Sequence, residues 1–116
     1  MTDDKEIRDV QEKMHNCVRA LQRLAPRVGA ARQIKEFNSD QRKNALAIVQ
    51  VPYLKSDTVS ASEILARANP VYIAKIEQLQ KDYADACAII AEWEATFARL
   101  EAARSIHAMM KELLTL

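Results

Sequence analysis

The chain has 116 residues, a length that fits one domain, and its formal net charge of +1 gives no overall attraction for a polyanion. It contains one glycine and three prolines, while the residue types that favour helices dominate. Because β-rich folds need frequent turn residues, these counts predict an all-α protein with short connections.

Neither a membrane span nor a secretory signal is predicted. The longest uncharged apolar stretch, residues 86–91, is far shorter than the roughly 18 residues of a membrane span, and the acidic residues 2–6 lack the apolar core of a signal. Cys17 and Cys87 both fall within helical patterns, so we expect small buried apolar residues and not a disulfide. We therefore expect a cytoplasmic protein that does not bind membranes.

The first predicted helix covers residues 4–25. Asp3 can cap it, with Glu6 at the third position of a capping box. Pro26 disfavours helical geometry in the preceding residue, so the helix should end or kink there, and Gly29 is a plausible end marker. The apolar residues recur with gaps of three and four, the heptad pattern of a packed helix: Ile7, Val10, Met14, Cys17, Leu21, Leu24 and Val28.

The middle of the chain, residues 30–51, is predicted as one bent helix or two short ones. Residues 38–40 are all good N-cap types, and Gln41 can complete a capping box from Asn38, which favours a break. One continuous helical face argues for a single helix: Ile34, Phe37, Gln41, Ala45 and Ile48. Both alternatives fit the sequence.

Two further helices are predicted. Pro52 ends the middle segment, residues 55–58 connect, and a capping box from Ser60 to Glu63 opens a short helix over residues 61–68. Asn69 followed by Pro70 is the signature of a helix start, and no glycine or proline follows.

The last predicted helix, residues 70–115, would therefore be long. About 45 residues at 1.5 Å each give roughly 68 Å, about twice the diameter of a sphere made from the whole chain. We therefore predict an elongated helical bundle or coiled coil, in which the long helix packs against the N-terminal helix and the short middle helices.

The apolar seam of this long helix changes direction. It follows a heptad through Tyr72, Ile76, Leu79, Tyr83, Ala86, Ile90, Trp93, Phe97 and Leu100, then resumes one residue early at Ala103, Ile106, Met110 and Leu113. One residue corresponds to about 100° of rotation about the helix axis, so the apolar face turns to another side of the helix near Leu100. Either a straight helix drifts from its heptad, or the helix passes from one packing partner to another.

The pattern predicts protein–protein interaction through helical packing. The first helix can cover only about half of the long one, so the middle helices or a second copy must cover the rest. We expect a homo-oligomer, with a dimer favoured, and a further protein partner for the exposed distal turns. The predicted interface residues are Ile90, Trp93, Phe97, Leu100, Ile106, Met110 and Leu113.

A basic segment supports an alternative function, nucleic-acid binding. Its basic residues are Arg19, Arg23, Arg27, Arg32, Lys35, Arg42 and Lys43, whereas residues 77–101 are mainly acidic. The two segments could instead flank one another in the fold or across a dimer. Because Phe37 is the one aromatic residue in the basic segment, base stacking is poorly supported, and nucleic acid is the less favoured partner.

Catalytic and metal-binding patterns are weak. Glu12 and His15 have the Glu-x-x-His spacing of di-iron bundles, but His107 lacks a matching glutamate and further carboxylates would be needed. The serines fall at predicted caps or on helix surfaces, and one glycine cannot form a phosphate-binding loop. We therefore predict no enzyme activity, no metal and no cofactor.

The segment from Trp93 to Leu113, WEATFARLEAARSIHAMMKEL, resembles the ends of small helical coiled-coil proteins from phages and prophages. Many of those proteins have no assigned activity. The resemblance covers about a fifth of the chain and carries no functional residue over. It implies an accessory to phage DNA metabolism or an inhibitor of a host system that acts by binding.

Overall fold

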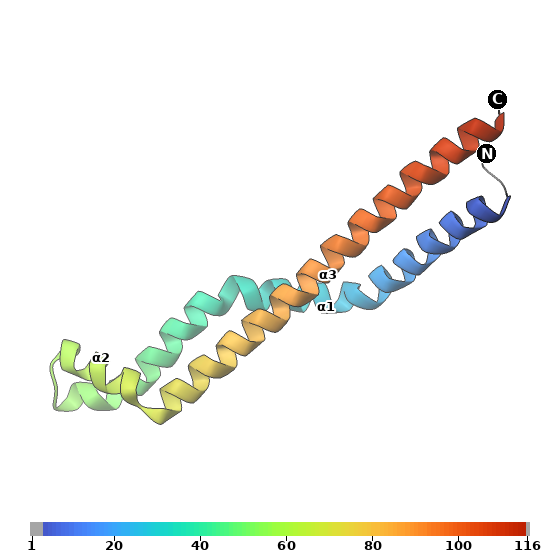
Figure 1. Ribbon diagram of the computed structural model, residues 1–116. Helices are drawn as coiled ribbons and strands as arrows, with labels where there is room; N and C mark the ends of the chain where they lie inside the picture. Colours follow the sequence, from blue (N-terminus) through green and yellow to red (C-terminus); the bar gives the residue numbers. More distant parts are fainter. Residues whose placement is uncertain (1–3, 116) are drawn as a thin grey trace. The chain divides into compact units, whose positions relative to one another are not determined.

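The computed structural model describes residues 4–115 and confirms the all-α fold (Figure 1). Along the chain lie α1 (Asp4–Gln50), the 3-10 helix η1 (Val51–Lys55), α2 (Val59–Ala68) and α3 (Pro70–Thr115). No strand occurs in residues 4–115. The long C-terminal helix is present with the predicted bounds, whereas the predicted cap at Asp3 lies outside the described residues.

The first helix was predicted to end or kink near residue 25. It does not end there but continues to Gln50. α1 runs through Pro26 and Gly29, and the expected separate helix or helices over residues 30–51 are part of it. The two helix-breaking residues, Pro26 and Gly29, are exposed, whereas Leu24 and Val28 close to them in the sequence are buried. Burying each of these two side chains contributes about 1.5–3 kcal/mol, which offsets the roughly 3 kcal/mol that an interior proline costs.

The contacts divide the chain into two compact units. Unit 1 comprises the residues up to Gly29 and those from Ala88 onward, and unit 2 comprises Ala30–Cys87. Within each unit a stretch of α1 lies antiparallel to a stretch of α3, as Figure 1 shows. The register is given by Gln11 facing His107 in unit 1 and by Asn38 facing Leu79 in unit 2.

The core of unit 1 follows the heptad predicted for the first helix. All seven of its positions are buried or half-buried, and the best covered are Val10, Leu24 and Val28. From α3, the buried residues are Ile90, Thr96, Leu100 and Ala103. Cys17 is half-buried and its thiol is free, as is that of Cys87 in unit 2.

In unit 2 most of the continuous helical face that the sequence shows on α1 is exposed. Ile34, Phe37 and Ile48 are exposed, with relative accessibilities of 37%, 47% and 73%. The buried residues are Ala31, Asn38 and Ala45, of which Ala45 alone belongs to that face, because the heptad spacing of the first residues of α1 continues past Gly29. Their counterparts on α3 are Leu79 and Ala86.

The connection between the long helices is ordered by side-chain hydrogen bonds. α1 ends at Gln50, with Pro52 in the first turn of η1, as predicted. The Gln50 amide donates to the Ser62 hydroxyl at 2.9 Å and to the Val59 carbonyl at 3.3 Å. Because Ser62 is fully buried, this amide fixes the start of α2 against the end of α1.

The cap of α2 differs from the prediction. The Thr58 hydroxyl accepts from the Ala61 amide at 3.2 Å, so the helix begins at Val59, and Ser60 lies inside it. The cap of α3 is as predicted: Asn69 Oδ1 accepts from the Val71 amide at 2.8 Å, and Pro70 is the first helical residue.

Candidate functional site

The seam of α3 shifts by one residue, as predicted, but the shift occurs at Thr96 and not beyond Leu100. Ile90 is buried and Trp93 half-buried, after which Thr96, Leu100 and Ala103 are buried. Phe97, which a regular heptad would bury, is 47% exposed. Thr96 takes its place with 2% exposure.

The seven predicted interface residues therefore fall into three groups. Ile90 and Leu100, at 9% and 3% exposure, are buried inside the chain and are not part of an accessible surface, contrary to expectation. Trp93 and Met110 are half-buried. The exposed members of the set, with accessibilities of 47%, 42% and 55%, are Phe97, Ile106 and Leu113.

The exposed members do not form one surface. Phe97 and Ile106 are nine residues apart, about two and a half turns, so they point to opposite sides of α3. Ile106 shares its side with Met109 and Leu113, which follow at spacings of three and four and are 57% and 55% exposed. We call Ile106, Met109 and Leu113 the distal stripe. The sequence pattern assigned Ile106 and Leu113 to the seam, whereas His107 and Met110 are the half-buried residues there.

An apolar groove of about 450 Å³ runs beside the distal stripe in unit 1. Ile106 lines it together with Val10 and Cys17 of α1 and the small residues Ala102 and Ala103 of α3. The small alanine side chains leave space between the two helices, and the exposed stripe borders it. This arrangement suits the insertion of apolar side chains from another helix.

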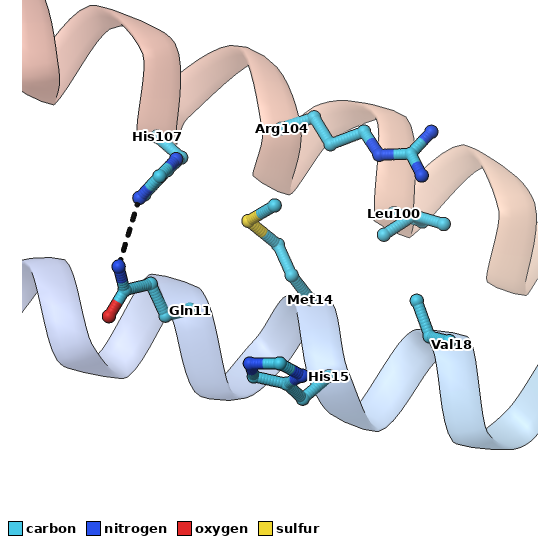
Figure 2. A pocket seen from close by; sticks show the side chains of 7 residues that line it. All are labelled: Gln11, Met14, His15, Val18, Leu100, Arg104 and His107. Atoms are coloured by element: carbon cyan, nitrogen blue, oxygen red, sulfur yellow. Dashed lines mark hydrogen bonds between the residues drawn. The ribbon is translucent and has the colours of Figure 1, made fainter.

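The other side of unit 1 has a more polar groove of about 370 Å³ (Figure 2). Gln11 Nε2 lies 3.3 Å from His107 Nε2, where the amide donates if that ring nitrogen carries no proton. Figure 2 shows Met14 pointing from α1 toward α3, with His107 on one side of it and Leu100 on the other. His15 is exposed and also lines this groove.

The chemistry of this polar groove is limited. Two imidazoles and an amide offer no carboxylate or thiolate, and in residues 4–115 no cluster of three or more His, Cys, Asp or Glu side chains is placed to hold a metal ion. The Glu12 and His15 pair thus has no further ligand in the described chain.

Unit 2 has a groove of about 550 Å³ between α1 and α3. Its α1 side includes Gln41, Asn44 and Ile48, and its α3 side includes Val71 and Lys75. The exposed residues Ile34, Phe37 and Ile48 follow the same side of α1, and we call them the α1 stripe. The sequence placed these residues on one continuous helical face without indicating whether that face is buried or exposed.

The basic residues of the alternative prediction lie on α1. Arg19, Arg23, Arg27, Arg32, Lys35 and Lys43 are exposed, whereas Arg42 is half-buried. Arg42 Nε is buried and has no hydrogen-bond partner among the described residues. Since α1 continues through Pro26, Arg19, Arg23 and Arg27 follow one another at the spacing that places them on one helical face.

The basic segment forms no ion pair with the acidic segment over residues 77–101 in the described part of the chain. The ion pairs present there lie within single helices, Arg67 with Glu63 and Arg104 with Glu101, each at 2.9 Å. The hydrogen bond to Glu63 raises the pKa of Arg67 above its ordinary value. Such exposed pairs contribute little to stability.

Comparisons with known proteins identify no relative. The chain matches no protein-family model, no curated protein and no solved structure. The resemblance to phage and prophage proteins stays an expectation. Within residues 4–115, none of the helices has a stretch long and apolar enough to cross a membrane.

Proposed function

We propose that this chain is a non-enzymatic helical interaction module that associates with a second copy of itself. The observation that carries the proposal is the distal stripe, in which three large apolar side chains are exposed in succession beside an apolar groove. Contiguous apolar surface of this kind is characteristic of interaction sites, because monomers rarely leave it in water.

The arrangement of unit 1 supports this proposal. Two antiparallel helices can bury only the residues that face each other, and each helix has two further sides that remain open. Ile106, Met109 and Leu113 lie on one such side of α3, with Ala102 and Ala103 next to them. A second helix pair seated there would cover the stripe and complete a four-helix arrangement.

Molecular mass in solution tests the proposal. Light scattering or sedimentation equilibrium at increasing concentration should give a mass rising from 13.1 kDa toward twice that value. A strict monomer at high micromolar concentration contradicts the proposal. Ile106→Glu should weaken association, since it places a charge on the distal stripe. Ala108→Glu is the matched control, because Ala108 is exposed and points away from the stripe.

A second candidate function, nucleic-acid binding, is supported by the exposed row formed by Arg19, Arg23 and Arg27. A mobility-shift titration with DNA and RNA over a range of salt concentrations tests it. Each phosphate contact removed by Arg23→Ala or Arg27→Ala should lower the salt slope by about 0.9 for duplex DNA. Absence of binding at low salt excludes this function.

A further inference from the structure

The side of α3 that carries the distal stripe continues toward the start of the helix with small residues. Ala102 lies four residues before Ile106, and Ala95 lies seven residues before Ala102, so both are on this side. Ala98 and Arg99 lie between the two alanines, one at each edge of the same side. All four of these residues are exposed, and Arg99 and Ala102 line the apolar groove. We call Ala95, Ala98 and Ala102 the alanine segment.

This exposed side of α3 therefore has a low part and a high part. The alanine segment is low, the distal stripe is high, and the two meet near the level of residue 104. A two-fold symmetric interface brings one patch against an identical patch, so each large side chain needs a small one on the same surface. A two-fold axis across α3 at residue 104 reverses the direction of the partner helix and meets this requirement. Within one residue, Ile106, Met109 and Leu113 then fall opposite Ala102, Ala98 and Ala95 of the partner subunit.

We infer that two copies of this chain dock through this side of α3 in an antiparallel orientation, with the distal stripe of each copy packed on the alanine segment of the other. This inference rests on the proposed self-association at the distal stripe, and it adds the orientation and the register of the two copies. All the residues that it uses belong to unit 1.

The apolar groove beside the distal stripe fits this register. Ala102 lines the groove together with Val10 and Cys17 of α1. Because Ile106 of the partner subunit falls opposite Ala102, its side chain lies at the mouth of the groove. Alanine at the contact also lets the two helices approach closely, near the lower end of the roughly 8–10 Å that separates packed helix axes. The large side chain therefore has space where the alanine leaves it.

A parallel two-fold arrangement fits the same surface poorly. It places every residue opposite its own copy, so the two distal stripes hold the helices apart and the alanine segments lose contact. It also places Arg99 opposite Arg99, which is a repulsion between like charges. In the antiparallel register Arg99 is level with Met109 of the partner subunit, so about 15 Å along the helix separates the two arginines. This separation exceeds the roughly 8 Å screening length of physiological salt.

The acidic residues of α3 are compatible with this contact. Glu94, Glu101 and Glu112 are exposed and lie about a quarter turn or more from the middle of the stripe. They therefore remain in water at the edge of the interface, where charges contribute little to binding. Between residues 95 and 113, Arg99 is the one charged residue on the docking side of α3.

The size of the surface predicts a moderate affinity. The stretch from Ala95 to Leu113 is roughly 27 Å long, and α3 with the adjoining groove is roughly 18 Å wide, which gives on the order of 500 Å² per copy. The total of about 1,000 Å² is at the lower limit for a specific interface. We therefore expect dissociation in the micromolar range.

The first test adds bulk to the alanine segment. Ala95→Arg puts a long side chain where Leu113 of the partner subunit must pack, so it should raise the dissociation constant, measured by sedimentation equilibrium, by about tenfold or more. Ala108→Arg is the matched control, because Ala108 is exposed and points away from this side of α3. Its dissociation constant should match that of the wild type. Circular dichroism checks that both variants keep their helices.

The second test measures the orientation and the register directly. Cys17 and Cys87 are replaced by alanine, and a chain carrying Ala102→Cys is mixed with a longer-tagged chain carrying Ile106→Cys. The antiparallel register places these two positions level with each other, so under mild oxidation the mixed disulfide should form faster than either homodimeric one. Parallel docking predicts the reverse order. The different chain lengths separate the three products on a gel.

The outcomes separate the inference from the proposed function. A dimer unaffected by Ala95→Arg, or a homodimeric disulfide as the fastest product, overturns the antiparallel docking of α3 while self-association stands. A wild-type monomer at every concentration overturns both. If Ala95→Arg fails to fold, the cross-linking pattern decides.

Discussion

The Asn38 side chain, in α1, donates a hydrogen bond of 3.1 Å to the backbone carbonyl of Leu79, in α3. Asn38 is only 7% exposed and lies in the apolar seam of unit 2. Sliding either helix along the other would bury this amide without a partner, which is costly. The pair therefore fixes the register of the two helices in unit 2, as a buried asparagine does in coiled coils.

Replacing Asn38 tests this hydrogen bond. Asn38→Asp removes the donor and places a carboxylate against a carbonyl oxygen, so unfolding by denaturant should show a loss of about 3 kcal/mol at neutral pH. Below the pKa of the introduced carboxyl its proton restores a donor, so the deficit should shrink as the pH falls. Asn38→Leu, the apolar control, should retain more stability than Asn38→Asp. Equal free energies of unfolding for Asn38→Asp and Asn38→Leu would contradict the hydrogen bond to the Leu79 carbonyl.

Pro26 offers a test of the continuous helix. Pro26→Ala supplies an amide that can donate to the carbonyl of Gln22, and it removes the steric conflict of the ring. The free energy of unfolding should rise by about 2–3 kcal/mol. Gly29→Ala is a comparison in the same turn, expected to add about 1 kcal/mol, because a Cβ there meets nothing within 4 Å. An unchanged free energy for Pro26→Ala would indicate an interrupted helix.

The cap of α2 distinguishes Thr58 from Ser60. Thr58→Ala removes the acceptor for the Ala61 amide and should lower the free energy of unfolding by about 1 kcal/mol. Ser60→Ala should leave it unchanged or slightly raised, because Ser60 lies within the helix and alanine favours helices. If thermal or chemical unfolding shows a larger loss for Ser60→Ala than for Thr58→Ala, the helix is capped by Ser60, as the sequence predicted.

Trp93 and Phe97 test where the seam of α3 shifts. Trp93 is half-buried, so Trp93→Ala should cost about 3 kcal/mol, measured at a concentration low enough to keep the protein monomeric. Phe97→Ala should cost less than about 1 kcal/mol, since nearly half of that side chain is already in water. Similar losses for the two would place Phe97 in the core.

The sequence predicted well where local and long-range signals agree. The heptad from Ile7 to Val28 and the start of α3 at Asn69 and Pro70 are both present in the structure. Up to Leu24 the apolar spacing meets no helix-breaking residue, and at Asn69 and Pro70 the capping chemistry marks the helix start, so tertiary packing has nothing to override there.

The failures occurred where tertiary packing outweighs local preference. Pro26 and Gly29 are breakers by propensity, but the buried face of α1 continues past them. Asn38 is polar, so hydrophobicity alone excluded it from the core. Its partner is a carbonyl 41 residues away, which no local pattern reveals. The sequence grouped Ile34 and Phe37 on one helical face, and no local signal shows that this face is exposed.

The exposed candidate surfaces were only partly predictable. Ile106 and Leu113 were predicted as apolar residues of distal turns that a partner could cover, and both are exposed, but the sequence did not separate them from the half-buried Met110. The one-residue shift of the α3 seam at Thr96 decides which residues of the last turns are buried and which are exposed. Because threonine is not strongly apolar, the sequence gives no hydrophobic signal for its place in the seam. The sequence therefore identified Ile106 and Leu113 as candidates without determining whether they point toward the packed seam or toward solvent.

The division into two units has a consequence for biosynthesis. Unit 2 is one continuous stretch, Ala30–Cys87, so all its contacts become available before the residues that follow Cys87 leave the ribosome. Unit 1 joins residues far apart in the sequence, and Val10, Leu24 and Val28 have no α3 partner until the residues from Ala88 onward have been made. We therefore expect nascent chains to carry a folded hairpin behind an uncovered N-terminal helix, which is a surface for chaperones to bind.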